Sequence, residues 1–513
     1  MFQNIGAYSG IVIIFTSVAH GAVAFCCSSV QHTFSSACER PFPSRMKICK
    51  APIHNRRGFN VFLSECSPTS STKTERTLRA EQWSPAKSDG QGQEFRDKIV
   101  LWRGEKAAGY SEQFRHLELS NVMVALGDKT EIERLTFTNV LACDGDSKLR
   151  DREVDLFDSA MQFVAAESGI PPSHDALVRA TERCSLIRET YEVLNQADTL
   201  EDLADLAIES NALKDFLTAT WRVRLRQFGP PERSDKKRRY GKNARSSLRA
   251  EKEAINSMAK LFIQFVGKVS LEDPECNLYI FEGTKGKKFI LARLIAKGAK
   301  TSDIAPRSRI CVTNTPLEEV AAFSLANFAR VKNGDNVLDP YAGSCATLLA
   351  AAFVAPQCNT VGIEIGLRKF VKKDDILADF SSRALKLPAA IIGGDSMNKR
   401  IRDRARRAVG VAPFDAIVTD PPYGIREKHG PDELPPLVQL LDVIIADRET
   451  GAPLLRKGGR LVAFVPVTAG QEIKSSLPSQ DQLDEAGLEV TEMREQLLSD
   501  TLSRWLVALT CTR

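Results

Sequence analysis

The chain has 513 residues, more than one domain usually holds, so two folded domains with extensions are expected. It is 43% hydrophobic and 26% charged, with a mean hydropathy of −0.20, as in ordinary soluble globular proteins. A net charge of +5 is too small to identify a nucleic-acid binder by itself. None of the 12 cysteines forms a CxxC pair, which excludes a thioredoxin-like motif and argues against a zinc site or a disulfide framework. No metal site is expected.

Residues 1–95 have the composition of a targeting extension. Gly10–Phe25 is an apolar run too short for a membrane span, and the segment after it is rich in Ser, Thr, Arg and Lys. This arrangement resembles a bipartite plastid presequence, with Phe25 after the signal core, and slightly favours a plastid protein. The alternative is a cytoplasmic protein with a disordered tail or a wrongly assigned start codon.

Residues 96–300 mix helical and strand patterns, which predicts an α+β domain. Strands are expected at 98–103 and 131–143, helices at 113–127 and 200–211, and both signals overlap at 176–194.

Residues 220–228 alternate strictly and predict a strand with Arg222, Arg224 and Arg226 on one face. The loop that follows, 231–249, is strongly basic and contains Lys236, Lys237, Arg238 and Arg239. Further positive charge follows along the chain at Lys285, Lys287, Lys288 and Arg293. A loop of this kind suits the phosphate backbone of tRNA, because each neutralised phosphate releases counterions. The alternative is a solvated insertion without a partner.

Residues 301–513 show the pattern of a doubly wound α/β domain. The short apolar strand 335–339 ends in Asp339, and the strands 360–363 and 389–392 lead into Glu364 and Asp395. A glycine-containing turn with Gly343 leads from the first strand into a helix at 347–354. Acidic residues at successive strand ends can accept ribose hydroxyls and an adenine amine. This pattern fits a nucleoside cofactor better than a pyrophosphate, which would require backbone amides without nearby carboxylates.

The most informative motif follows the fourth strand, 414–419. It consists of Asp420, Pro421, Pro422, Tyr423 and a glycine. The Asp420 carboxylate and the Pro421 carbonyl can accept the two N–H protons of a base amine and orient its nitrogen toward a methyl donor. The prolines stiffen the turn, and Tyr423 can stack on a base removed from its helix. The alternative is a rigid surface turn without a function. It is less favoured because the strands before the motif carry the pattern of a nucleoside-cofactor site.

Several segments resemble the catalytic subunits of the eukaryotic tRNA guanosine-10 N2-methyltransferases. The resemblance covers about residues 96–513. It rests on these segments: FRHLELSNVMVALG (114–127), ATERCSLIRETYEV (180–193), FILARLIAKGAK (289–300), NTPLEEVAAFSLANFARVKNGDNVLDPYAGS (314–344), TDPPYGIRE (419–427), LLRKGGRLVAFVPV (454–467) and LSRWLVALT (502–510).

The resemblance implies a Rossmann-like class I methyltransferase domain over 301–513, after a THUMP-containing tRNA-binding region over 96–300. It implies S-adenosylmethionine as methyl donor, and tRNA held by the THUMP region through its shape. It also implies a small zinc-binding activator subunit as partner, covering exposed apolar surface. The implied cofactor-binding residues are Asp339, Tyr341, Gly343, Glu364 and Asp395, and the implied catalytic residues are Asp420, Pro421, Pro422 and Tyr423.

One position departs from the family pattern. Cys345 stands where the family's first cofactor motif has its second glycine, and its side chain is expected to weaken cofactor binding if the backbone there needs a left-handed conformation. Two alternatives to the tRNA enzyme remain open: an amino-methyltransferase acting on DNA adenine or protein glutamine, and a catalytically silent tRNA-binding protein.

Overall fold

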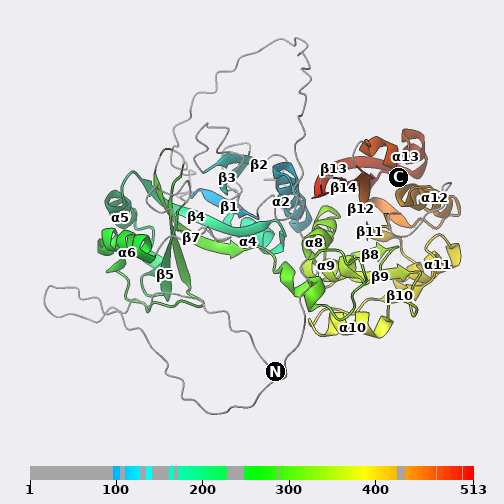
Figure 1. Cartoon of the computed structure of the whole chain (residues 1–513), viewed down its shortest axis with the longest axis horizontal. Helices are drawn as coiled ribbons and strands as arrows, with labels where there is room; N and C mark the ends of the chain where they lie inside the picture. Colours follow the sequence, from blue (N-terminus) through cyan, green and yellow to red (C-terminus); the bar gives the residue numbers. More distant parts are fainter. Residues whose placement is uncertain are drawn as a thin grey trace, which may run out of the picture. The chain divides into compact units, whose positions relative to one another are not determined.

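The structure is a computed structural model. It describes residues 96–103, 110–127, 135–140, 161–166, 172–227, 248–284, 286, 288–423, 434–468, 471–499 and 501–513. These residues belong to one compact unit, Ala86–Arg513, and their strands form two separate sheets (Figure 1). The extension expected over residues 1–95 lies outside the described residues. Among the described helices, none is long and apolar enough to cross a membrane.

The first sheet has seven strands in the order β2-β3-β1-β4-β7-β6-β5. Neighbouring strands are antiparallel except β5 and β6. Its strands are β1 (Lys98–Trp102), β2 (Leu135–Asn139), β3 (Met161–Ala166), β4 (Ile187–Ala197), β5 (Trp221–Gln227), β6 (Cys276–Glu282) and β7 (Phe289–Lys297). The helices of this half are α2 (Glu112–Leu126), α4 (His174–Arg183), α5 (Leu200–Glu209), α6 (Leu248–Ser257) and α7 (Ala259–Phe262).

The elements expected in this half are found, and the ambiguous segment 176–194 divides into two. Ser173 caps α4 by accepting a hydrogen bond from the Ala176 amide, and α4 ends at Cys184, whose backbone is extended. β4 begins three residues later, at Ile187. Helices α2 and α4 bury their apolar sides with Val100 and Trp102 of β1 in one core cluster.

The second sheet has seven strands in the order β10-β9-β8-β11-β12-β14-β13. All pairs are parallel except those of β14, which is antiparallel to β12 and β13. Its strands are β8 (Asn336–Asp339), β9 (Asn359–Glu364), β10 (Ala390–Gly393), β11 (Phe414–Thr419), β12 (Leu455–Thr468), β13 (Leu488–Ser499) and β14 (Leu502–Cys511). The order reverses between β8 and β11, which confirms the expected Rossmann-like, doubly wound architecture.

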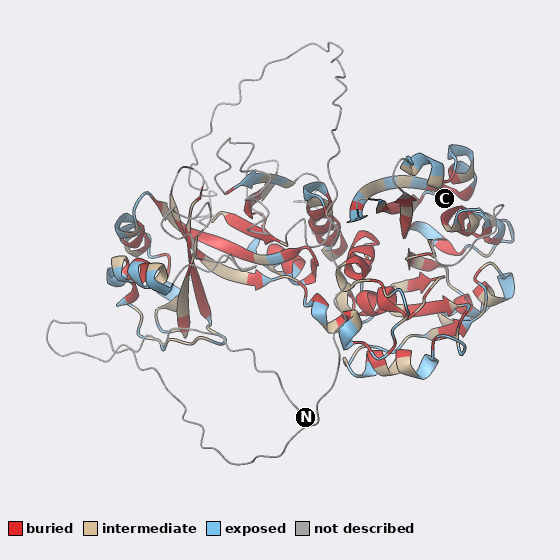
Figure 2. Cartoon of the chain, in the orientation of Figure 1, coloured by how far each residue is buried: buried red, intermediate tan, exposed pale blue. Residues whose placement is uncertain are grey.

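Helices cover both faces of this sheet (Figure 1). One core cluster contains α8 (Glu319–Phe328), α9 (Ala346–Val354) and α10 (Lys373–Ser381), and the other contains α11 (Lys399–Ala408), α12 (Pro436–Glu449) and α13 (Gln480–Ala486). Except for β13, the strands between these layers are mostly buried (Figure 2). Parallel strands β8, β9, β10 and β11 therefore end at one edge of the sheet, which is where a ligand site is expected in such folds.

Candidate active site

Four acidic residues lie at that edge, one at the end of each of the strands β8, β9, β10 and β11. Asp339 and Glu364 are the last residues of β8 and β9, Asp395 follows β10 by two residues, and Asp420 follows β11 directly. The strand pairing fixes their order along the edge as Asp395, Glu364, Asp339 and Asp420. The structure thus brings together residues that are spread over 339–420 in the sequence.

Asp339 joins three elements. Its Oδ1 accepts hydrogen bonds from the Tyr341 amide at 3.0 Å and from the Thr419 hydroxyl at 2.8 Å, and its Oδ2 accepts one from the Thr347 hydroxyl. The side chain is 1% exposed, and this burial raises the pKa of Asp339 to about 7, although the three hydrogen bonds oppose the rise. Because the Asp339 carboxylate already accepts three hydrogen bonds from the protein, its main role is to fix the turn after β8.

The turn after β8 is linked to the end of β9. The Gly343 amide donates to Glu364 Oε2 at 2.8 Å, and the Gly366 amide donates to Oε1 at 2.7 Å. Gly343 has a φ of +49°, and a Cβ built on it meets no atom within 4 Å. A glycine here therefore allows the left-handed backbone and leaves free space beside the Glu364 carboxylate, where an adenosine ribose would fit.

Tyr341 and Asp395 lie at the β10 end of this edge. Burial raises the pKa of Tyr341 to about 12, and the nearby Asp395 carboxylate adds to the rise. Asp395 is exposed, and its Oδ1 accepts a hydrogen bond from the Met397 amide at 2.9 Å. An exposed carboxylate at this position is free to meet the amine of an adenine ring.

Cys345 adopts the left-handed conformation on which the sequence-based concern rested. Its φ and ψ are 61° and 30°, and it is the N-cap residue of α9. The side chain has no exposed surface and belongs to the core cluster that contains α8 and α9. The backbone at this position would favour glycine, but the thiol is packed in the core.

The Asp420 carboxylate is in direct contact with Tyr423. The Tyr423 hydroxyl donates to Asp420 Oδ1 at 2.6 Å, and Pro421 between them is buried. Burial raises the pKa of Asp420, although the charge of Arg504 and the Tyr423 hydrogen bond lower it in part. A carboxylate with a raised pKa is a better proton acceptor, so this pair suits a reaction that removes a proton from an amine.

Arg504 of β14 supports this pair from behind. It donates to Gln496 Oε1 at 2.7 Å and to Glu318 Oε1 at 2.8 Å, its guanidinium lies 4.2 Å from the Phe464 ring centroid, and its Nη1 is 3.5 Å from the Tyr423 hydroxyl. Only 5% of Arg504 is exposed. These contacts fix the guanidinium next to Tyr423 and Asp420.

The three arginines expected to face RNA lie on β5, as predicted, and all are half-buried. Two of them contact protein groups. Arg226 donates to Glu189 Oε2 at 2.6 Å and lies 4.6 Å from the Tyr279 ring centroid, and Arg222 donates to Asn277 Oδ1 at 2.8 Å. The basic cluster Lys236, Lys237, Arg238 and Arg239 lies outside the described residues, so its role as a tRNA contact stays a prediction.

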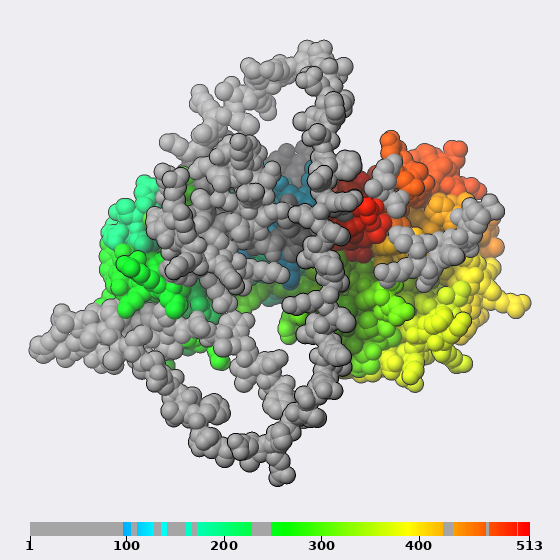
Figure 3. Space-filling view, in the orientation of Figure 1, coloured from blue at the N-terminus to red at the C-terminus, as the bar shows by residue number. Residues whose placement is uncertain are grey.

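Sequence reasoning assigned no role to Arg504, Thr347 or Thr419, which complete the site, nor to a set of basic side chains on α11. Lys399, Arg400, Arg404 and Arg407 are exposed on that helix, whose atoms lie on the surface in the space-filling view (Figure 3). Arg504 lies in the segment 502–510, which resembles the methyltransferase family, but only the fold shows what it contacts. No cluster of three or more His, Cys, Asp or Glu side chains in the described part of the chain could hold a metal ion.

The sequence comparisons agree with this geometry. Residues 306–439 match the family model UPF0020, described as "RMKL-like, methyltransferase domain". The chain is 30% identical over 294 residues to tRNA (guanine(10)-N(2))-methyltransferase TRMT11 of Xenopus laevis. The aligned part covers 50% of this chain and 59% of that protein. It is 26% identical over 293 residues to the Homo sapiens protein of the same name, covering 48% of this chain and 61% of that one.

The chain thus spans about three fifths of the length of these curated relatives. The crystal structure of TrmN from Thermus thermophilus aligns with a TM-score of 0.40 and 15% identity, covering 81% of this chain and 99% of that one. Residues 306–439, with β8, β9, β10, β11 and their acidic ends, are therefore similar in sequence to a methyltransferase domain, within a chain similar over about half its length to tRNA methyltransferases.

Proposed function

We propose that this chain is an S-adenosylmethionine-dependent methyltransferase that methylates the exocyclic N2 amine of guanine 10 in tRNA. The observation that carries the proposal is the Asp420–Tyr423 pair after β11, one strand away from the Gly343–Glu364 turn. A base amine placed at Asp420 would lie beside a cofactor placed at that turn.

The residues at the sheet edge fit this cofactor. Glu364 keeps a free lone pair on each oxygen for the ribose hydroxyls, since each oxygen accepts only one amide hydrogen bond. Asp395 is exposed at the position for the adenine amine, and Gly343 leaves space beside the Glu364 carboxylate. S-adenosylmethionine supplies an electrophilic methyl group on its sulfonium.

The protein's part in the reaction is to bind the amine and to accept its proton. The Asp420 carboxylate and the Pro421 carbonyl accept hydrogen bonds from the two N–H groups, which orients the nitrogen lone pair toward the methyl group. Forming the N–C bond would break the C–S bond of the sulfonium and leave a neutral thioether. The nitrogen would then carry the positive charge and lose one proton to Asp420, whose raised pKa favours that transfer. Tyr423 and Arg504 hold the carboxylate in place.

The substrate and partner are inferred from the relatives. The curated relatives named above are tRNA (guanine(10)-N(2))-methyltransferases, and the chain is similar to them over about half of its length. The resemblance also supports a small zinc-binding activator subunit. Ile365 and Phe370, next to the cofactor turn, are 78% and 76% exposed and provide apolar surface that such a subunit could cover.

The test is transfer of labelled methyl groups to an unmodified tRNA transcript, with the full chain alone and co-expressed with the activator subunit, followed by identification of the modified nucleoside. We expect N2-methylguanosine at position 10. Asp420→Ala should lower the rate at least about 100-fold, because the amine loses its proton acceptor, while tRNA and cofactor affinity stay nearly unchanged.

Asp442→Asn on the exposed side of α12 is the control and should retain full activity. Undiminished turnover by Asp420→Ala would disprove the mechanism. A wild-type chain that binds tRNA but neither binds nor uses the cofactor would instead be the silent tRNA-binding protein.

A further inference from the structure

Glu318 is a carboxylate beside the Asp420 motif to which the reaction so far gives no role. It is the N-cap residue of α8, yet its side chain makes no capping hydrogen bond to that helix. Its Oε1 instead accepts three hydrogen bonds, from the Tyr110 hydroxyl at 3.0 Å, from Gln496 Nε2 at 2.7 Å and from Arg504 Nη2 at 2.8 Å. Its Oε2 accepts none from any residue that the structure describes.

The free oxygen belongs to an exposed side chain. The Glu318 side chain is 42% exposed, whereas that of its partner Arg504 is 7% exposed. Three donors on Oε1 fix the orientation of the carboxylate, so Oε2 remains as an acceptor in a defined position. A preorganised acceptor of this kind can bind an N–H group of a ligand.

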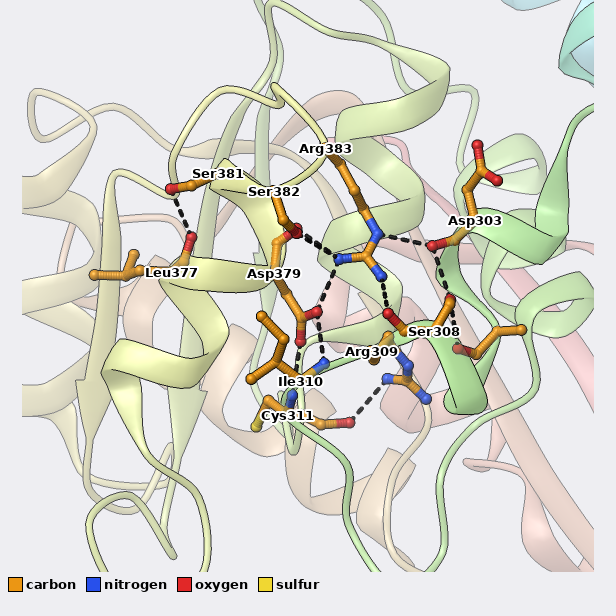
Figure 4. Close-up of polar contacts among 12 residues, drawn as sticks. Asp303, Ser308, Arg309, Ile310, Cys311, Leu377, Asp379, Ser381, Ser382 and Arg383 are labelled. Carbon is orange, nitrogen blue, oxygen red and sulfur yellow. Dashed lines mark hydrogen bonds and ion pairs between the residues drawn. The ribbon is translucent and has the colours of Figure 1, made fainter. Parts of the chain in front are cut away.

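A carboxylate with a purely structural role has different surroundings. Asp379 of α10 is fully buried, and both of its oxygens are used. It accepts the amides of Ile310 and Cys311 and the guanidinium of Arg383, each at 2.8 Å (Figure 4). Glu318 is also paired with an arginine, but it keeps one oxygen without a partner on an exposed side chain.

Glu318 is separated by one guanidinium group from the pair that receives the base amine. Arg504 donates to Glu318 through Nη2, and its Nη1 is 3.5 Å from the Tyr423 hydroxyl, which donates to Asp420 at 2.6 Å. Nη1 and Nη2 are bonded to the same carbon. Burial raises the pKa of Asp420, and the negative charge of Glu318 adds to the rise. Glu318 is therefore within reach of a base whose amine is bound at Asp420.

The chemistry of guanine indicates which atom Glu318 would meet. The N1–H group and the N2 amine of guanine are bonded to the same ring carbon. An amine bound by Asp420 and the Pro421 carbonyl therefore brings N1–H to the next acceptor along that edge of the base. Adenine has no hydrogen on N1 and presents a lone pair there, which a carboxylate would repel.

Building on the proposed function, we infer that Glu318 is a specificity-determining residue whose free oxygen accepts a hydrogen bond from the N1–H group of the target guanine. Tyr110, Gln496 and Arg504 hold its other oxygen in place. The amine still reacts at Asp420, so the loss of Glu318 acts on the choice of base. This role favours guanine over the adenine substrate that the sequence left open.

The experiment compares two tRNA transcripts in the methyl-transfer assay above, with the full chain and the activator subunit. One carries guanine at the target position, and the other carries 2-aminopurine, which keeps the reactive amine but has no hydrogen on N1. The wild-type chain should prefer guanine at least about 10-fold in kcat/KM, because 2-aminopurine presents a lone pair to the carboxylate.

Glu318→Gln should lower this preference at least about 10-fold. Its oxygen can stay with Arg504, so its amide nitrogen takes the place of Oε2 and presents a donor to N1 of 2-aminopurine. Glu318→Ala has neither the acceptor nor the repelling charge, so it should lower the preference as well.

Glu319→Gln is the matched control, because Glu319 is the next residue of the chain and forms no hydrogen bond or ion pair with the described residues. It removes the same charge and should keep the wild-type preference. Asp379→Asn, from the cluster of Figure 4, controls for stability. It should lower the free energy of unfolding without changing the preference.

The inference is overturned if the Glu318 variants slow both transcripts by the same factor, if they change neither, or if Glu319→Gln lowers the preference as much. These three outcomes leave the proposed function standing. A wild-type chain that methylates neither transcript would overturn the proposed function and this inference together.

Discussion

Asp339 shows how one residue can organise the site without carrying the reaction. Its carboxylate ties the end of β8 to α9 through Thr347 and to β11 through Thr419. The same three elements carry the cofactor turn and the Asp420 motif. The cost of this arrangement is electrostatic, because a fully buried carboxyl group resists ionisation.

This electrostatic cost should make the free energy of unfolding depend on pH. Burial raises the pKa of Asp339 from its ordinary value of 3.8 to about 7, so the folded state holds the proton more tightly than the unfolded state does. The Asp339 contribution to the free energy of unfolding is therefore greatest below about pH 4 and decreases by about 4 kcal/mol as pH rises to about 7. Asp339→Asn lacks this titration, so its stability relative to wild type should increase over the same window.

Urea unfolding of both proteins between about pH 4 and about pH 8 measures the difference. Asp442→Asn, exposed on α12, should run parallel to wild type throughout. Parallel curves for Asp339→Asn as well would show that Asp339 titrates normally in the fold.

Cys345 is a second case where local sequence and tertiary packing act on one residue. Its backbone is left-handed, which is the condition under which a side chain here was expected to weaken cofactor binding. Its side chain, however, is buried among core residues of α8 and α9. The thiol therefore contributes packing that a glycine at this position could not.

Among the elements, α2 shows how a helix of the N-terminal half stabilises the catalytic half. Phe114 of α2 lies with its ring 5.1 Å from that of Phe328 in α8. Glu118 of α2 is fully buried and accepts hydrogen bonds from the Ser185 amide at 2.9 Å, the Leu186 amide at 2.8 Å and Asn327 Nδ2 at 2.8 Å. One carboxylate thus joins α2, α8 and the turn before β4.

Removing that carboxylate should destabilise both halves. Glu118→Ala leaves two buried backbone amides and the Asn327 side chain without their acceptor, and should lower the free energy of unfolding by roughly 3 kcal/mol or more. Glu118→Gln keeps one acceptor oxygen and should lose less. Denaturant unfolding followed by circular dichroism gives the values.

The control is Glu201→Ala on the exposed first turn of α5, which should stay within about 0.5 kcal/mol of wild type. Equal stability of Glu118→Ala and Glu201→Ala would mean that the Glu118 hydrogen bonds contribute nothing net.

For the whole molecule, the distribution of charge matters more than its sum. The net charge is only +5, but basic residues concentrate in the sequence segment 231–249 and on the exposed side of α11. On β5, by contrast, Arg226 is paired with Glu189, so part of its charge is neutralised within the protein. The loop is therefore the stronger candidate for phosphate contact.

Replacing Lys236, Lys237, Arg238 and Arg239 by Ala should weaken tRNA binding and flatten its salt dependence. Each lost phosphate contact lowers the slope of log affinity against log salt by about 1, so the four together lower it by at most about 4. Filter binding over a range of salt concentrations measures the slope.

The charge-matched control replaces Lys399, Arg400, Arg404 and Arg407 on α11 by Ala. An unchanged slope in the loop variant, or an equal change in both variants, would return the loop to the interpretation as a solvated insertion.

The sequence by itself determined the elements that depend on neighbours close along the chain. Alternating and helical periods located β1, α2 and β5, a short apolar run located β11, and acidic residues after short apolar strands located Glu364 and Asp420. The strand–turn–helix order also predicted the doubly wound sheet, because parallel strands with helical crossovers can connect in few ways.

Only the tertiary structure decided which distant side chains meet. Arg504 is 81 residues from Tyr423, and it reaches that hydroxyl because β14 runs antiparallel next to β12. Arg309 is 35 residues from Ser344, and the two meet because the segment before α8 lies against the turn after β8. Periodicity reports which face of an element is buried, but not which element covers it. Contacts between distant residues therefore depend on how the whole chain packs.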